Sequence, residues 1–510
     1  MTLQENDFFA PSTTSPIEYL LNDFEKEKVT IDEVAIFMQK KDVVATLPYF
    51  KQGMNERQYS SAWVFDAESA TKALSAKYWG KALAVTDVLD FMPSKKRDEW
   101  KEQVSSMQTP AFEAETVHAT LKTLLAQRMD FLAEMVDGIF TGLSREHITN
   151  RPEAFCKRMI IDCVCDAYSS YGDRKIGLIH DMRCVIAKLM GRDENVPYCT
   201  TRSLIRIAQT DLGQWFNVDG NAFRIRVYKK GTAHLEINQD IAYRLNQILA
   251  YLHPMAIPAP HKKRPNKKPA KGFELMERPL PFAVLDSLSL VTINGNTLSF
   301  TRSYFADKHV HAEVCDVLMA LGGVRDGDNF VFGYDIRPIL NHVIASGVMP
   351  DQKTHQFYPT NSDLARKIVE NADIQSDDSV LEPSAGQGGI IDAIGDCGGV
   401  TAIEASGLHC KILAKKIGDT NVICGDFLKL NLDQFDKIVM NPPFSQGRAK
   451  AHVQHAVTML AEGGRLVAIL PASFYGKDIV DGMTHKWHGI HDNEFARTSV
   501  SVAILELTHR

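Results

Sequence analysis

Residues 378–390 read DSVLEPSAGQGGI, and the fold of the second half of the chain can be inferred outward from them. The apolar residues 379–381 predict a short strand, glycines follow at Gly386, Gly388 and Gly389, and a helical pattern starts at Ile390. A strand, a glycine turn and a helix form the opening unit of a nucleotide-binding α/β fold. The glycines allow the backbone to approach a ligand closely, because no Cβ intervenes.

The next two predicted strands each end near an acidic residue. Residues 400–403 lead into Glu404, which lies 22 positions after Glu382, and residues 422–424 lead into Gly425-Asp426-Phe427. An acid at the end of the second strand can accept hydrogen bonds from ribose hydroxyls. Asp426 can accept a hydrogen bond from an adenine amino group, and Phe427 can cover the adenine ring. These positions therefore predict a site for a cofactor that contains adenosine.

The fourth predicted strand, residues 437–440, ends in Asn441-Pro442-Pro443-Phe444, which is the most specific signal in the chain. A buried amino group has two N–H bonds to satisfy, and the Asn441 side-chain oxygen and the Pro442 carbonyl can accept one each. The prolines fix φ and stiffen the loop, so both acceptors are held in place. Phe444 offers a flat face on which a base can stack. These four residues are the predicted catalytic set.

In their order and wording these motifs resemble those of amino-group DNA methyltransferases. The segment Phe357-Tyr358-Pro359-Thr360 precedes LEPSAGQGG (381–389), an order that resembles the gamma class of N6-adenine enzymes. The resemblance covers residues 355–510 and implies a Rossmann-like class I methyltransferase domain with S-adenosyl-L-methionine as its cofactor. The chain departs from the family at Thr360, which follows Pro359, whereas the family usually has Thr before Pro.

The resemblance also implies roles for single residues. Thr360 and Glu382 would help to hold the methionine end of the cofactor, Glu404 the ribose and Asp426 the adenine. The predicted cofactor-binding set is Phe357, Thr360, Glu382, Pro383, Ser384, Ala385, Gly386, Gly388, Glu404, Asp426, Phe427 and Asn441.

Composition and periodicity divide the chain into four predicted segments. The predicted fold class is α/β, with the methyltransferase domain C-terminal and preceded by a mostly α-helical region that contains a β-hairpin. Helical spacing is clear over residues 117–140, 155–168 and 177–190, and Gly142 is expected to end the first of these. The segments are a helical N-terminal domain (1–253), a Pro/Lys-rich linker (254–281), a small α/β module (282–350) and the methyltransferase domain (351–510).

Within the small module, residues 287–292 and 298–302 are predicted strands, 311–321 a helix, and a further strand lies near 330–332. The N-terminal region resembles the DUF4942-type module of unknown function that is found fused to such methyltransferases in phage and plasmid genomes. Residues 227–235, VYKKGTAHL, and residues 65–79 carry that likeness.

Charge is divided unevenly along the chain, although the net charge is only −6. Residues 201–271 hold 13 Lys and Arg against 4 Asp and Glu, whereas residues 351–510 hold 15 against 20. This division favours contact with phosphates in the first segment and chemistry in the second. The predicted hairpin, residues 223–237, would present candidate DNA-binding cations, with a merely solvated face as the alternative. They are Arg224, Arg226, Lys229 and Lys230.

Other features limit location and cofactors. The chain has no signal-peptide pattern and no apolar run of about 18 residues, so we expect a cytoplasmic protein without a membrane span. Its nine cysteines are scattered and form no C-x-x-C, which favours reduced thiols and no metal site.

The predicted function is methylation of adenine N6 in DNA by direct transfer to a flipped-out base, with site-specific or relaxed sequence recognition. The resemblance also suggests a restriction-modification setting, in which methylation shields mobile DNA from restriction. An RNA base or a protein glutamine amide as acceptor remains open, because each presents an amino group on a planar system. A non-catalytic DNA-binding or anti-restriction protein is the remaining alternative. The recognition sequence and oligomeric state are not predicted.

Overall fold

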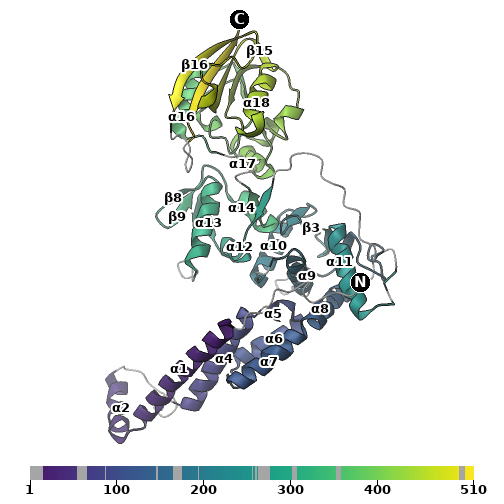
Figure 1. Ribbon diagram of the computed structural model, residues 1–510, viewed down its shortest axis with the longest axis vertical. Coiled ribbons are helices and arrows are strands. Elements are labelled where there is room, and N and C mark those ends of the chain that lie inside the picture. Colours follow the sequence, from purple (N-terminus) through teal and green to yellow (C-terminus); the bar gives the residue numbers. More distant parts are fainter. Residues whose placement is uncertain are drawn as a thin grey trace. The chain divides into compact units, whose positions relative to one another are not determined.

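The computed structural model consists of two compact units, residues 1–267 and 268–510 (Figure 1). The boundary between them falls inside the segment predicted as the linker, most of which lies outside the described residues. Among the helices that are described, none combines the length and hydropathy needed to cross a bilayer. The structure describes residues 15–53, 66–86, 88–144, 147–164, 175–192, 195–255, 257–258, 261, 276–300, 307–351, 358–492 and 500–510.

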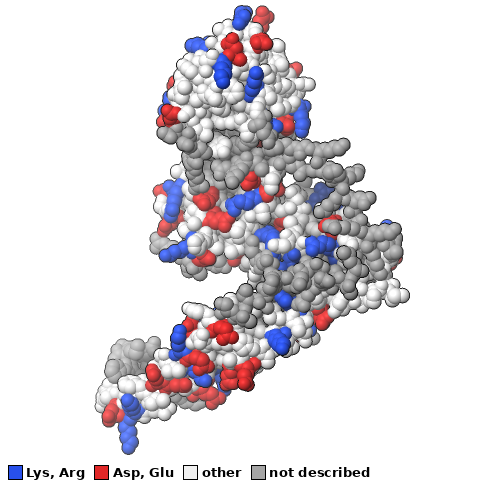
Figure 2. All heavy atoms as spheres, viewed as in Figure 1, with Lys and Arg blue, Asp and Glu red and all other residues white. Residues whose placement is uncertain are grey.

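The first unit begins with helices that share one aromatic core (Figure 1). Trp79 is fully buried at its centre, where its indole nitrogen donates to the carbonyl of Pro110 at 2.8 Å and its ring contacts Phe112. Lys, Arg, Asp and Glu side chains are interspersed over the face of this helical arm drawn in Figure 2. The helices that contribute to this core are α1 (Ser15–Met38), α4 (Ala67–Val85), α5 (Val88–Phe91), α6 (Ser94–Ser105) and α7 (Ala114–Ala126), whereas α2 (Lys41–Gly53) follows α1 and has no described side chain in it.

The rest of the first unit combines four helices with a small antiparallel sheet of order β1-β4-β3-β2. The hairpin predicted from alternating residues is confirmed, with Gly231 at positive φ between its strands. The elements are α8 (Arg128–Gly142), β1 (Arg158–Ile161), α9 (Ile176–Leu189), α10 (Tyr198–Thr210), β2 (Phe216–Val218), β3 (Phe223–Val227), β4 (Ala233–Ile237) and α11 (Gln239–Leu252).

Two sequence predictions in this unit were wrong. The continuous helix predicted over residues 117–140 is two helices, α7 and α8, separated at Gln127. The described part of the helix predicted over residues 155–168 contains strand β1 instead, because the run Met159-Ile160-Ile161 pairs with β4 and is buried, and residues 165–168 lie outside the described residues. A short apolar run cannot be assigned to helix or strand by periodicity alone.

A buried ion pair joins helix α9 to the turn before β3. Arg183 donates to both carboxylate oxygens of Asp219 at 2.8 Å, and its side chain is 1% exposed. The guanidinium also donates to the hydroxyls of Thr200 and Thr201. Because both charges are removed from water, each depends on the other for compensation.

The small module of the second unit is held together by three helices and two short sheets. Strand β5 (Glu277–Pro279) pairs with β10 (Val348–Pro350), and four further strands form a sheet of order β6-β7-β9-β8. The strand predicted at residues 287–292 was wrong, since residues 287–289 end helix α12 and strand β6 begins only at Thr292. The remaining elements are α12 (Phe282–Ser289), β6 (Thr292–Asn294), β7 (Thr297–Ser299), α13 (Lys308–Ala320), β8 (Val324–Asp326), β9 (Asn329–Val331) and α14 (Arg337–Ser346).

The larger part of the second unit is a seven-stranded mixed sheet of order β13-β12-β11-β14-β15-β17-β16. The first five strands are parallel, and β17 runs antiparallel between β15 and β16. Helix α16 packs on one buried cluster of the sheet and α18 on another. The elements are α16 (Ser362–Ala372), β11 (Ser379–Glu382), β12 (Gly399–Glu404), α17 (Gly407–Ile417), β13 (Val422–Cys424), β14 (Phe435–Met440), α18 (Arg448–Val457), β15 (Leu460–Pro471), β16 (Met483–His491) and β17 (Val502–His509).

The four parallel strands predicted around the glycine loop are confirmed, but the helix predicted to start at Ile390 is only a 3-10 turn, Ile391–Ala393. Glycines at 395, 398 and 399 follow at once, and glycine is a poor helix former. The last strand of the chain, β17, lies inside the sheet, and β16 and β13 form its two edges.

Replacing Arg183 by Met should leave the carboxylate of Asp219 buried without its partner. We expect the free energy of unfolding of the first unit to fall by about 3–5 kcal/mol, measured by hydrogen exchange of the α9 and β3 amides. The control is Lys72→Met, which removes the cation of the exposed Lys72–Glu68 pair and should cost less than about 0.5 kcal/mol. Equal losses in the two variants would contradict this account of the buried pair.

Candidate active site

A cavity of about 270 Å³ lies where the carboxyl ends of β11, β12, β13 and β14 meet. Parallel strands end at the same edge of a sheet, so side chains that follow them in sequence converge there. The lining residues come from the glycine loop, the three other strand ends, the segment before α16, helices α17 and α18, and the small module. They are Gly322, Tyr358, Pro359, Thr360, Glu382, Pro383, Ser384, Ala385, Gly386, Gln387, Gly389, Asp392, Glu404, Ala405, His409, Lys416, Gly425, Asp426, Phe427, Asn441, Pro442, Pro443, Phe444, Arg448 and His452.

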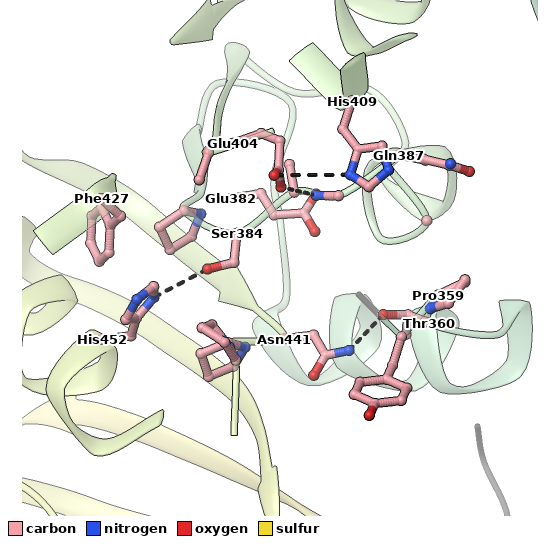
Figure 3. Close-up of a pocket in the computed structure, with 18 of the residues that line it drawn as sticks. Pro359, Thr360, Glu382, Ser384, Gln387, Glu404, His409, Phe427, Asn441 and His452 are labelled. Atoms are coloured by element: carbon pink, nitrogen blue, oxygen red, sulfur yellow. Dashed lines mark hydrogen bonds and ion pairs between the residues drawn. The ribbon is translucent and has the colours of Figure 1, made fainter. Parts of the chain in front are cut away.

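Glu404 ties the glycine loop to the segment after β12 (Figure 3). Its Oε2 accepts from the backbone N–H of Gly386 at 2.8 Å, and its Oε1 accepts from the N–H of Ser406 at 2.7 Å. Burial raises the pKa of this carboxyl, and the backbone hydrogen bonds oppose that rise. Each carboxylate oxygen can accept more than one hydrogen bond, so Glu404 can still receive hydroxyl donors from a ligand.

Glu382 is the least satisfied polar group of the cavity. Its side chain is 2% exposed, and within the described part of the chain its Oε2 has no hydrogen-bond partner. Burial first, and then the nearby charge of Glu404, raise the pKa of Glu382 well above its ordinary value. A buried acceptor without a donor is costly, so this position suits a ligand that brings a cationic donor.

A hydrogen-bonded series runs from Asp426 to the glycine loop. Arg448 donates to Asp426 Oδ1 at 2.9 Å and lies 3.5 Å from His452 Nε2, and His452 Nδ1 lies 3.1 Å from the hydroxyl of Ser384. Burial raises the pKa of Asp426, but the hydrogen bond and charge of Arg448 outweigh it, so the net shift is downward. Burial lowers the pKa of His452 to about 4, so its imidazole is neutral at pH 7.

The Asn441 side chain is oriented by a residue far away in sequence. Asn441 Nδ2 donates to Thr360 Oγ1 at 3.1 Å, as Figure 3 shows, so the donor end of the amide is satisfied. Asn441 Oδ1 is then the acceptor end that is available to the cavity. Phe444 is half-buried between the two clusters that cover the sheet, and Pro442 and Pro443 line the cavity beside it.

The structure brings together nearly all of the residues predicted for catalysis and cofactor binding. Gly388 is the exception among those described, because it does not line the cavity and an added Cβ would meet Leu413 at 3.1 Å. Phe357 lies outside the described residues. Thr360 lines the cavity and bonds to Asn441, although its motif departs from the family pattern.

Sequence reasoning missed several lining residues: Gly322, Gln387, Asp392, His409, Lys416, Arg448 and His452. Arg448 and His452 could have been found, because they stand four apart in the helical sequence that follows Phe444 and therefore share a face. Gly322 could not, since 60 positions separate it from Glu382.

One pair of cysteines differs from the reduced state predicted from the sequence. Cys410 on α17 and Cys424 at the end of β13 form a disulfide, with a Cα–Cα distance of 5.8 Å. The bond joins the helix that follows Glu404 to the strand that precedes Asp426.

The predicted DNA-binding cations belong to the first unit and do not line this cavity. Arg224 donates to Glu236 Oε2 at 2.7 Å. The guanidiniums of Arg224 and Arg226 lie 4.8 and 4.6 Å from the ring centroid of Trp215. Lys229 and Lys230 are exposed in the hairpin turn.

Comparison with known proteins finds similarity over parts of the chain. Residues 71–254 match the family described as "Domain of unknown function (DUF4942)". Curated relatives include proteins named "Probable ribosomal RNA small subunit methyltransferase A" from Methanothermobacter thermautotrophicus (34% identity, 19% of this chain and 37% of the relative) and Thermococcus onnurineus (39% identity, 19% and 37%). The chain therefore spans little more than a third of the length of these relatives.

Among solved structures, a dimethyladenosine transferase from Plasmodium falciparum aligns over 30% of this chain and 64% of its own, with 18% identity and a TM-score of 0.26. TrmN from Thermus thermophilus aligns over 40% and 68%, with 16% identity and a TM-score of 0.25.

The burial of Glu382, with one carboxylate oxygen unpartnered among the described residues, predicts how stability depends on pH. A carboxyl whose pKa is raised by folding stabilises the fold below its unfolded pKa, and that stability is lost as the pH rises through the folded pKa. The isosteric variant Glu382→Gln should therefore melt at a higher temperature than the wild type at about pH 8 and near the wild-type temperature at about pH 4. Differential scanning calorimetry of the ligand-free protein measures both.

The matched control is Glu370→Gln, which changes an exposed carboxyl on α16 and should leave the melting temperature unchanged at both pH values. A Glu382→Gln variant that melts below the wild type at pH 8 would show that the carboxyl is stabilised by a partner.

Proposed function

We propose that the second unit is an S-adenosyl-L-methionine-dependent methyltransferase that modifies the N6 amino group of adenine in a nucleic acid. The observation that carries the proposal is the Asn441–Thr360 hydrogen bond at the end of β14. It presents an amide oxygen toward the same cavity that holds Glu404 and Asp426 at the ends of β12 and β13. One cavity thus offers acceptors for a target amino group and for the polar groups of an adenosine cofactor.

The described residues fit the proposed cofactor. Glu404 would accept from the ribose hydroxyls, Asp426 from the adenine amino group, and Glu382 from the ammonium of the methionine moiety. The unpartnered Oε2 of Glu382 supports the last assignment, because a cationic donor there would remove its unfavourable burial. When bound, this cofactor supplies an activated methyl group.

Asn441 and Pro442 would act on the acceptor nitrogen. The lone pair of adenine N6 is delocalised into the ring, which makes the nitrogen a weak nucleophile. Hydrogen bonds to Asn441 Oδ1 and the Pro442 carbonyl favour the pyramidal, more nucleophilic nitrogen and stabilise the positive charge that it gains. Phe444 would stack against the base, which must leave its own stack at a cost of a few kcal/mol. This arrangement requires no strong base and no cysteine nucleophile.

The kind of nucleic acid is the point on which the supporting observations differ. The sequence motif LEPSAG favours DNA by its resemblance to DNA methyltransferases, whereas the curated relatives are named for ribosomal RNA. RNA is therefore the second candidate acceptor, and the comparisons support it better than DNA. Asn441 cannot distinguish between them, because adenine presents the same amino group in both.

A pair of variants tests whether Asn441 serves methyl transfer and Glu404 serves cofactor binding. Asn441→Ala should lower methyl transfer by at least about a hundredfold while the dissociation constant for S-adenosyl-L-methionine changes little, since the missing acceptor serves the transition state. Glu404→Ala should instead raise that dissociation constant by about tenfold to a hundredfold, because the cofactor then has no charged acceptor at its ribose. Calorimetry and a labelled-methyl assay measure the two effects. Near wild-type transfer by Asn441→Ala would refute the assignment.

We further propose that the outward face of the hairpin binds the backbone of the nucleic acid. Cross-strand pairing sets Arg158, Glu236, Arg224 and Asn217 in one row across the sheet, and Arg226 lies in the next row. Glu236 is the acid of this group, and it is paired with Lys157 as well as Arg224. The stacking of both arginines on Trp215 restricts their motion, so less entropy is lost when they meet phosphates.

Lys229 and Lys230 are the most suitable residues for a test of this surface, because both side chains are exposed. Replacing both by Ala should weaken binding and make the log–log dependence of affinity on salt shallower by about 0.9 for each duplex phosphate that is no longer neutralised. The control is Lys40→Ala with Lys41→Ala, an adjacent exposed pair at the start of α2. Fluorescence anisotropy with labelled oligonucleotides gives the slopes. Identical slopes for the two double variants would mean that the hairpin cations are merely solvated.

A further inference from the structure

The small module of the second unit contacts the cavity through the glycine loop. Gln387, at the tip of that loop, donates from its side-chain amide to the carbonyl oxygen of Ala320, the last residue of α13. Two residues further on, Gly322 lines the cavity together with Gln387. The module therefore supplies part of the cavity wall.

The contact at Ala320 satisfies a carbonyl group at the carboxyl end of helix α13. The last four carbonyl groups of a helix have no N–H partner inside the helix, and a side-chain amide can satisfy one of them. Gln387 does this from a different part of the fold. Because Gln387 stands between Gly386 and Gly388, the bond also restrains the loop whose Gly386 N–H is held by Glu404.

A side chain at Gly322 would have a strained backbone conformation and would touch the glycine loop. Its φ is +85°, which L side chains rarely adopt, and an added Cβ would lie 3.4 Å from Gln387 Oε1. By contrast Gly327, in the turn between β8 and β9, has a φ of +61° but no atom within 4 Å of an added Cβ. The two glycines share the same kind of backbone strain and differ in their position relative to the cavity.

The small module makes a second contact with α17, the helix that follows Glu404. Lys411 on α17 lies 3.2 Å, Nζ to Nδ1, from His342 on α14. Burial, and then the charge of Lys411, lower the pKa of His342 to about 4, so the imidazole accepts this hydrogen bond at pH 7. Helix α17 begins three residues after Glu404. The module thus contacts both segments that carry the acceptors for the ribose and the methionine moiety.

We infer that the corner 320–322 of the module is a wall of the cofactor site and that Gln387 is a positioning residue that holds the glycine loop in its cofactor-binding shape. The inference rests on the proposed function, because it assigns the cavity to S-adenosyl-L-methionine. It gives the small module a role in cofactor affinity, separate from any contact with nucleic acid.

The first experiment compares Gly322→Ala with Gly327→Ala in the full-length protein. Both variants place a Cβ at a positive φ in the same module, so both should lower its melting temperature. Only Gly322→Ala should weaken binding of S-adenosyl-L-methionine, by about threefold to tenfold, in isothermal titration calorimetry. Equal cofactor affinities in the two variants would overturn the inference.

The second experiment changes the loop side of the contact and remains informative if Gly322→Ala does not fold. Gln387→Met keeps the length of the side chain but loses the donor, and Gln387→Lys keeps a donor within reach of the α13 carboxyl end. We expect the Met variant to bind the cofactor about threefold to tenfold more weakly, with an unchanged KM for the nucleic acid, and the Lys variant to recover affinity. Wild-type affinity in the Met variant would overturn the positioning role.

The wild-type titration separates the two proposals. If the wild-type protein binds S-adenosyl-L-methionine and the variants bind it equally well, the wall inference fails and the proposed function stands. If the wild-type protein does not bind this cofactor at all, both fail.

Discussion

The carboxylate of Glu404 is the group on which the arrangement of the cavity depends. It accepts from Gly386 on one side and from Ser406 on the other, so one side chain fixes both the glycine loop after β11 and the start of α17. Those hydrogen bonds offset part of the effect of burying its charge. With the two segments held, the ends of β11 and β12 form a rigid edge to which β13 adds Asp426 and β14 adds Asn441. A ligand can therefore be bound without reordering the loop, which favours affinity.

The same cavity retains polar groups that the free protein leaves poorly compensated. Glu382 is buried beside Glu404 with one oxygen unpartnered, whereas Asp426 and Asn441 are each held by a neighbouring side chain. This difference has a physical meaning, because strain and unsatisfied groups persist where a ligand relieves them. The inner strands of the surrounding sheet are almost entirely buried. The stability that this sheet gains from its burial compensates for the unfavourable burial of Glu382. In our account, stability is lost at this position so that a cationic group can be recognised.

Sequence reasoning succeeded where local pattern and tertiary position agree. Residues 379–381, 400–403, 422–424 and 437–440 are short, mostly apolar runs that are each followed by a polar or glycine-containing motif, so their strands and their shared edge could be predicted. It failed at β1, where pairing with β4 decided between helix and strand, and after Ile390, where clustered glycines shorten the expected helix. Gly322 was beyond prediction, because its place in the cavity comes from the packing of α13 against Gln387.

The most direct test of the central claim is the chemical identity of the methylated product. The full-length protein can be incubated with methyl-labelled S-adenosyl-L-methionine and with DNA, RNA and protein in separate reactions, followed by digestion and mass spectrometry. Our account predicts labelled N6-methyladenine, and the sugar that carries it, deoxyribose or ribose, identifies the acceptor. Label found only in guanine or in a glutamine side chain, or no label in any reaction although the cofactor binds, would contradict it.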